Sequence, residues 1–124
     1  MGFQLKAVQA LDLWRGAIVE SVRRDGPDLS ARQMALLLTV YLTPPSHTVR
    51  GLALTLNVSK PAITRALDRL SELGLVKRKV DETDRRSVLV QRTVKGSVYL
   101  REFGDMIVAA AQTAGDETAS QPAT

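Results

Sequence analysis

The feature that most constrains this sequence is a pair of helical patterns separated by only three residues. Apolar residues at helical spacing predict one helix over Val49–Leu56 and a second over Lys60–Leu73, which Gly74 ends. Between them, Asn57 accepts a positive φ at a lower cost than most residues, and Ser59 is a good N-cap. Two helices joined by so short a turn must cross and touch, so the sequence predicts a helix-turn-helix.

The inner surface of these helices is predictable too. A steep crossing requires a small residue where the helices touch, and Ala53 lies four residues before Asn57. Pro61 falls in the first turn of the second helix, where the N–H that proline lacks would have no intrahelical partner. The remaining inward positions are filled by the apolar residues Leu52, Leu56, Val58, Ile63 and Ala66.

A hairpin pattern follows the second helix. Two short apolar runs, Leu75–Val80 and Ser87–Thr93, flank the charged segment DETDRR, which is Asp81–Arg86. The runs predict two strands and the charged segment predicts the tip between them. Helix, turn, helix and hairpin in this order form a winged helix-turn-helix. The predicted fold class is therefore mainly α with a small β-wing.

The outward face of the second helix is polar and carries Lys60, Thr64, Arg65, Asp68 and Arg69. An arginine can form two parallel hydrogen bonds with a guanine edge, and a threonine can contact a base or a thymine methyl group. These side chains therefore suit a helix that lies in the major groove of DNA. The alternative is an ordinary solvated helix face of mixed charge.

Four segments of this region resemble the MarR family of winged-helix transcription factors. They are Ser59–Arg69, the Gly-Leu-Val-x-Arg exit at Gly74–Arg78, the wing Asp81–Arg86 and the Thr-x-x-Gly helix start at Thr93–Gly96. The likeness spans residues 29–103. It implies a recognition helix over 60–73 and a wing over 75–93.

The resemblance also implies roles for single residues. A wing-tip arginine of the family enters the DNA minor groove, and Asp84 with Arg86 match the paired positions, with Arg85 as the fallback. An arginine gains there from the negative potential of a narrow groove. The complete set of expected DNA-binding residues is Ser59, Lys60, Pro61, Thr64, Arg65, Arg69, Arg85 and Arg86.

The ends of the chain predict helices for dimerisation. Apolar spacing predicts one helix over Phe3–Arg24 and another over Val94–Ala114, so residues 1–114 form one domain with dimerisation helices 1–24 and 94–114. Residues 115–124 (GDETASQPAT) have no large apolar side chain, and we expect them to be disordered. Relatives normally add a further helix there, so a weaker dimer than usual is expected. The candidate dimer contacts are Phe3, Leu11, Trp14, Phe103, Met106 and Ile107.

Composition narrows the function class. From Lys60 to Arg101 there are eleven Lys or Arg against five Asp or Glu, so the net charge of +4 is concentrated in the helix and wing expected to bind phosphates. A basic membrane-surface helix fits poorly, because these charges lie on a helix and a hairpin without a shared apolar face. No apolar run approaches the ~20 residues that span a bilayer.

Catalytic and metal sites are not predicted. The chain has no cysteine and one histidine, and its acidic wing tip lacks the glycine and distant glutamate of a calcium loop. No signal-peptide pattern begins the sequence, so a cytoplasmic protein is expected. We predict no enzyme activity, no metal and no cofactor.

The predicted function is that of a sequence-specific repressor that binds pseudo-palindromic double-stranded DNA as a homodimer. A second reading is a winged-helix protein-interaction module, in which the same face binds another protein and does not bind DNA specifically. A third keeps DNA binding and adds a small aromatic effector, which many members of the family bind near the dimerisation helices. Trp14 would lie near such an effector, or would simply be a core residue.

Overall fold

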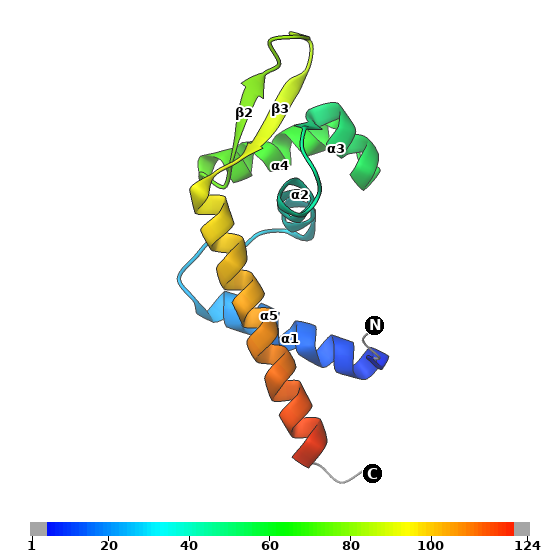
Figure 1. The fold of residues 1–124 in the computed structure, drawn as a ribbon, viewed down its shortest axis with the longest axis vertical. Helices are drawn as coiled ribbons and strands as arrows, with labels where there is room; N and C mark the ends of the chain where they lie inside the picture. The colour runs from blue at the N-terminus through cyan, green and yellow to red at the C-terminus, as the bar shows by residue number, and fades with distance from the viewer. Residues whose placement is uncertain (1–4, 121–124) are drawn as a thin grey trace. The chain divides into compact units, whose positions relative to one another are not determined.

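The computed structural model of the chain describes residues 5–120, and the side chains as far as residue 113 (Figure 1). It is mainly helical with one small antiparallel sheet, which confirms the predicted fold class. Two compact units are present: the winged unit, Leu29–Leu100, and the terminal unit, whose described part combines residues 5–28 with 101–120. The elements, in chain order, are α1 (Ala7–Arg23), α2 (Ala31–Leu42), β1 (His47–Thr48), α3 (Val49–Leu56), α4 (Lys60–Glu72), β2 (Val76–Val80), β3 (Val88–Arg92) and α5 (Val94–Ser120).

The turn between α3 and α4 forms as the sequence predicts. Asn57 has φ 55° and ψ 47°, the left-handed conformation that ends α3. This lets the Val58 N–H donate to the carbonyl of Ala53 at 3.1 Å. Ala53, in the second half of α3, is buried. The Ser59 hydroxyl accepts a hydrogen bond from the Ala62 N–H at 3.2 Å and so caps the N-terminus of α4. The helix-turn-helix is therefore confirmed.

The core of the winged unit lies among α2, α3, α4 and the sheet. Its centre is formed by large aliphatic side chains that are almost completely removed from water, which is the main stabilising term of such a small domain. Helix α2 is unusually apolar because it lies in this centre. The largest fully buried side chains are Leu36, Leu37, Leu52, Ile63, Leu67, Leu70, Leu75 and Val40.

The sheet has the strand order β1-β3-β2, with antiparallel pairing throughout. The hairpin pairs Val76 with Arg92 and Val80 with Val88, and it projects beyond the helices of the winged unit (Figure 1). Both strands are slightly shorter than predicted. Strand β1 was not predicted, because two residues of sequence carry no strand periodicity. It pairs His47 with Val90, which places the single histidine at the sheet edge.

A hydrogen-bonded junction fixes both ends of the hairpin. The Tyr41 hydroxyl of α2 contacts the Leu75 carbonyl at 2.6 Å and accepts from the Thr93 N–H at 2.8 Å. The Thr93 hydroxyl donates to the Gly74 carbonyl at 2.8 Å and accepts from the Gly96 N–H at 2.9 Å, which caps α5. A Cβ on Gly96 would collide with the Tyr41 hydroxyl and the Leu75 carbonyl. This contact explains physically why the Thr-x-x-Gly segment ends in glycine.

The terminal unit consists of α1 and the later turns of α5. The rings of Trp14 and Phe103 meet edge to face, with their centroids 5.9 Å apart. A Cβ on Gly16 would lie 3.1 Å from the Cβ of Ala110, so the two helices approach closely at this glycine. This close approach accounts for a glycine inside a helix, where it otherwise costs roughly 1 kcal/mol relative to alanine.

The ends of the terminal helices differ from the prediction. Helix α1 begins at Ala7, and the Lys6 N–H before it donates to the Gln9 side chain at 3.0 Å; the predicted start at Phe3 lies outside the described residues. Helix α5 continues to Ser120, beyond the end predicted at Ala114. Gly115 does not stop the helix. Residues 121–124 lie outside the described part.

Candidate nucleic-acid interface

Helix α4 has one buried and one exposed side. Its inward side chains Ala62, Ile63 and Leu67 are buried in the core. Because residues four apart lie on the same side of a helix, Lys60, Thr64 and Asp68 form one exposed row. Arg65 and Arg69 form the neighbouring row. All five predicted outward side chains are therefore exposed.

A groove separates α4 from the wing. We call it the helix–wing groove, and it brings together four of the residues predicted from the sequence: Lys60 and Thr64 of α4 with Asp84 and Arg86 of the wing tip. Ser59, Pro61, Arg65, Arg69 and Arg85 do not line it. The complete lining is Thr48, Val49, Arg50, Lys60, Thr64, Arg78, Asp84, Arg86, Ser87 and Val88.

Two lining arginines were missed by the sequence analysis. Arg50 lies in the first turn of α3, where only the inward face had been interpreted. Arg78 belongs to the Gly-Leu-Val-x-Arg segment, but nothing in the sequence showed that β2 directs its side chain toward α4. The signal for Arg50 was its position two residues after Thr48, whose hydroxyl accepts from the Gly51 N–H at 2.9 Å and caps α3.

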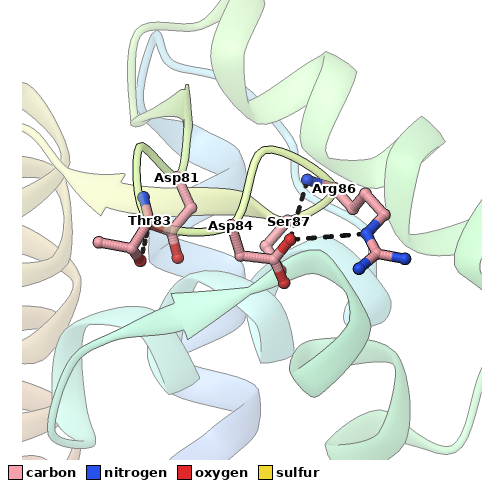
Figure 2. A network of polar contacts seen from close by, with 5 residues as sticks. All are labelled: Asp81, Thr83, Asp84, Arg86 and Ser87. Atoms are coloured by element: carbon pink, nitrogen blue, oxygen red, sulfur yellow. Dashed lines mark hydrogen bonds and ion pairs between the residues drawn. The ribbon is translucent and has the colours of Figure 1, made fainter.

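Two aspartates order the wing tip (Figure 2). The Asp81 carboxylate accepts from the Thr83 hydroxyl at 2.7 Å and from the Thr83 N–H at 2.9 Å. These hydrogen bonds favour the charged carboxylate and lower the pKa of Asp81 below its ordinary value. Asp84 accepts from the Arg86 N–H at 3.1 Å, and the Ser87 N–H donates to the Asp84 carbonyl at 2.9 Å. The tip is thus held by its own side chains.

Arg86 extends from this tip into solvent. Its Nε lies 3.8 Å from Asp84 Oδ1, yet its side chain is 97% exposed. Figure 2 shows the Asp84 carboxylate facing the backbone nitrogen and the Nε of Arg86. An aspartate that orients an exposed arginine without covering it leaves the guanidinium available to a ligand.

The cations around α4 divide into paired and unpaired groups. Arg78 pairs with Asp68 at 2.8 Å, Arg86 with Asp84 at 3.8 Å, and Arg69 with Glu72 at 3.9 Å. Among the described side chains, the cations here without an ion pair are Arg50, Lys60, Arg65 and Arg85. An exposed cation without an acidic neighbour is the group most available to a phosphate.

Most of the winged unit matches a known protein family. A family model described as MarR family matches residues 28–87, which contain α2, the helix-turn-helix and the wing tip. This region of the chain belongs to the MarR family.

Solved structures have a similar fold. A mutant of MepR from S. aureus has 19% identity and a TM-score of 0.72, over 92% of this chain and 85% of that chain. A S. aureus MepR–DNA complex has 20% identity and a TM-score of 0.71, over 90% and 88%. A mutant of MarR from E. coli has 22% identity and a TM-score of 0.66, over 94% and 87%. The chain thus has the fold of MarR-family transcription regulators.

The residues predicted to contact a second MarR-family subunit lie in the terminal unit. Leu11 is 69% exposed and Trp14 is 45% exposed, whereas Phe103 is buried within the single chain against Trp14. Met106 and Ile107 are half-buried, and Phe3 lies outside the described residues. Leu11 and Trp14, with Val8, Asp12, Arg15 and Ile18, line a shallow and mostly apolar hollow on α1.

Other kinds of site find no support between residues 5 and 120. No cluster of three or more His, Cys, Asp or Glu in that range could hold a metal ion. No helix in that range is long and apolar enough to cross a membrane.

Proposed function

We propose that this protein is a transcriptional repressor that binds double-stranded DNA through α4 and the wing. The observation that carries the proposal is the helix–wing groove, which places Lys60 and Thr64 of α4 beside Arg86 of the wing. A MepR–DNA complex among the solved structures of the same fold supports it. Such a role requires the compartment that holds the DNA, which in a bacterial cell is the cytoplasm.

Helix α4 supplies the contacts to the major groove in this proposal. Arg65 forms no ion pair among the described side chains, so its guanidinium is free to form two hydrogen bonds with a guanine edge. Thr64 contacts a neighbouring base, and Lys60 and Arg69 hold phosphates. Ser59 and Pro61 begin the helix where its free N–H groups can also face a phosphate.

The wing supplies the contacts to the minor groove. Arg86 enters that groove, and Asp84 orients it through the backbone N–H and the ion pair at 3.8 Å. Narrow A·T-rich grooves have an enhanced negative potential, which attracts an inserted arginine. Arg85, which is exposed at the same tip and has no ion pair among the described side chains, holds the adjacent phosphate.

The terminal unit supplies the surface on which a second subunit packs. Its apolar stripe on α1 is exposed in the single chain, including Val8 at 77% and Leu11 at 69%. A contiguous apolar face of this kind normally packs against a partner. A homodimer formed on it has a two-fold axis, and two recognition helices related by that axis fit pseudo-palindromic half-sites about one helical turn, roughly 34–36 Å, apart. Repression then requires only that the dimer occupy DNA needed by the transcription machinery.

One experiment separates this function from a protein-interaction module. Duplexes are selected from a random pool with the wild-type protein, and binding to the selected and to a scrambled duplex is measured over a salt series. We expect a palindromic consensus, preference for the selected duplex of at least about 10³-fold, and an affinity that falls linearly on logarithmic axes with salt. Failure to enrich any consensus, or equal affinity for both duplexes, would leave the protein-interaction module as the better reading.

A further inference from the structure

An acidic residue lies on the surface proposed to face DNA. Asp68 is exposed on α4, four residues after Thr64 and three after Arg65, so it shares their side of the helix. A free carboxylate at this position would repel the phosphates that the neighbouring cations attract. A DNA-binding helix with this residue therefore requires something that neutralises it.

Arg78 of β2 is the neutralising group. Its Nη1 lies 2.8 Å from Asp68 Oδ1, the shortest ion pair among the described side chains. It is also the only one of these pairs that joins residues more than four positions apart, and it connects α4 to the hairpin. The Arg78 side chain is 30% exposed against 53% for Asp68, so the arginine is the more sheltered partner.

We propose that Arg78 is a positioning residue for DNA binding, which neutralises Asp68 and draws its carboxylate from the recognition face toward the wing. This inference rests on the proposed function and adds a residue to it. Exposed ion pairs contribute little to folding stability, so the consequence of this one lies in the charge and orientation of the surface. Arg78 acts through Asp68 and touches neither a base nor a phosphate.

The test is a double-mutant cycle on DNA binding. The variants are Arg78→Ala, Asp68→Asn and the two together, measured on the selected and the scrambled duplex over a salt series. Arg78→Ala leaves the carboxylate unpaired, and we expect it to weaken binding to both duplexes by about tenfold. Asp68→Asn in the same chain should restore the affinity to within about threefold of wild type, because the repelling charge is gone.

Asp68→Asn alone gives a second readout that a purely structural role would not change. It leaves Arg78 without its partner and adds a net positive charge beside the helix–wing groove. We expect stronger binding to the scrambled duplex, a salt slope steeper by about one, and a lower ratio of selected to scrambled affinity.

Lys79→Ala is the matched control. Lys79 is the next residue of β2, so its side chain points to the opposite face of the hairpin, where it lies 4.0 Å from Glu82. The Lys79→Ala variant removes one positive charge from the same strand as Arg78→Ala does, and we expect its selectivity between the two duplexes to equal that of wild type. Thermal unfolding of every variant shows whether it is folded, and Arg78→Gln replaces Arg78→Ala if the alanine variant is not.

Three results would overturn the inference. If the double variant binds as weakly as Arg78→Ala, then Arg78 itself contacts DNA. If Asp68→Asn loses affinity for the selected duplex alone, then Asp68 accepts a hydrogen bond from a base such as cytosine. If wild type binds neither duplex, the proposed function fails first and this inference falls with it, an outcome recognisable because no variant then has a reference affinity.

Discussion

The winged unit and the terminal unit bury their apolar side chains to very different extents. In the winged unit, Leu36, Ile63 and Leu67 are completely buried, and most large aliphatic side chains surround them. In the terminal unit, Ala17 and Phe103 are buried among the described side chains, while Val8 and Leu11 lie mostly in water. The winged unit therefore has a closed aliphatic core within a single chain. The terminal unit has an apolar face that a second chain would have to cover.

The largest expected effect tests how closely the winged unit is packed at the junction of Tyr41 with the hairpin. Gly96→Ala places a Cβ against the Tyr41 hydroxyl and the Leu75 carbonyl, so either the junction opens or α5 shifts. We expect a loss of about 3 kcal/mol in the free energy of unfolding, the upper end for an overpacked site. Urea unfolding measures it.

Gly104→Ala is the matched control, because nothing lies within 4 Å of a Cβ at that position in the same helix. It should stabilise the protein by up to about 1 kcal/mol, since alanine favours a helix over glycine. Equal stability of the two variants would show that the junction does not hold the hairpin.

The second prediction concerns the exposed face of the terminal unit. Leu11→Asp should barely change the stability of a single chain, because the side chain is 69% exposed. If that face is the dimer interface, the dissociation constant should rise by about 30-fold, or about 2 kcal/mol. Sedimentation from nanomolar to tens of micromolar protein measures this, with and without duplex DNA.

The matched control replaces an equally exposed leucine of the other unit. Leu54 of α3 is 76% exposed, and Leu54→Asp should leave the assembly unchanged. If wild type is monomeric throughout and binds a single half-site with full affinity, the terminal unit does not form the dimer. An Ile107→Asp variant with unchanged assembly and DNA binding would contradict the contribution of α5.

The third prediction separates reading of bases from holding of phosphates on α4. Arg65→Ala should cost about 2 kcal/mol on the selected duplex and relax specificity at one base pair. Lys60→Ala should weaken selected and scrambled duplexes alike and reduce the salt slope by about one. Equal loss on both duplexes for Arg65→Ala would remove its base-reading role. Because both side chains are exposed, neither variant should unfold the winged unit.

The two units also differ in what the sequence could predict. The helix-turn-helix was predictable because its signals are local: Asn57 adopts the left-handed turn, and Ser59 caps the next helix. The wing and the exposed face of α4 followed from periodicity. The Tyr41 junction and the Asp68–Arg78 pair were not predictable, because each joins residues that are distant in sequence and depends on the packing of whole elements. The end of α5 was missed because a composition poor in apolar residues does not by itself stop a helix.

The fourth prediction concerns the wing tip. Arg86→Ala should reduce affinity most on duplexes with A·T-rich flanks, by about 1 kcal/mol, the low end for one specific contact to DNA. Asp84→Ala should cause a smaller loss, since it frees the orientation of Arg86 but keeps its charge. If the double variant Arg85→Ala, Arg86→Ala binds DNA as tightly as wild type, the wing does not contact DNA.

The smallest expected effect is a pH dependence confined to the wing tip. Hydrogen bonds from Thr83 lower the pKa of Asp81, so the charged carboxylate is favoured in the folded tip. The contribution of a group with a lowered pKa is complete above its unfolded pKa, about 3.9 for an aspartate, and is lost as the pH falls through the folded value. We therefore expect the Thr83 amide to stay protected from hydrogen exchange at pH 5 and to lose protection only below about pH 4. NMR titration of the Asp81 side chain measures the pKa directly.

Thr83→Val is the matched control, because it removes the hydroxyl donor and keeps the N–H, so the pKa of Asp81 should move back toward the ordinary value. The core of the winged unit has no side chain in this network, so its amides should remain protected over the same range. If core and tip lost protection together, the tip would not be an independently ordered part of the winged unit.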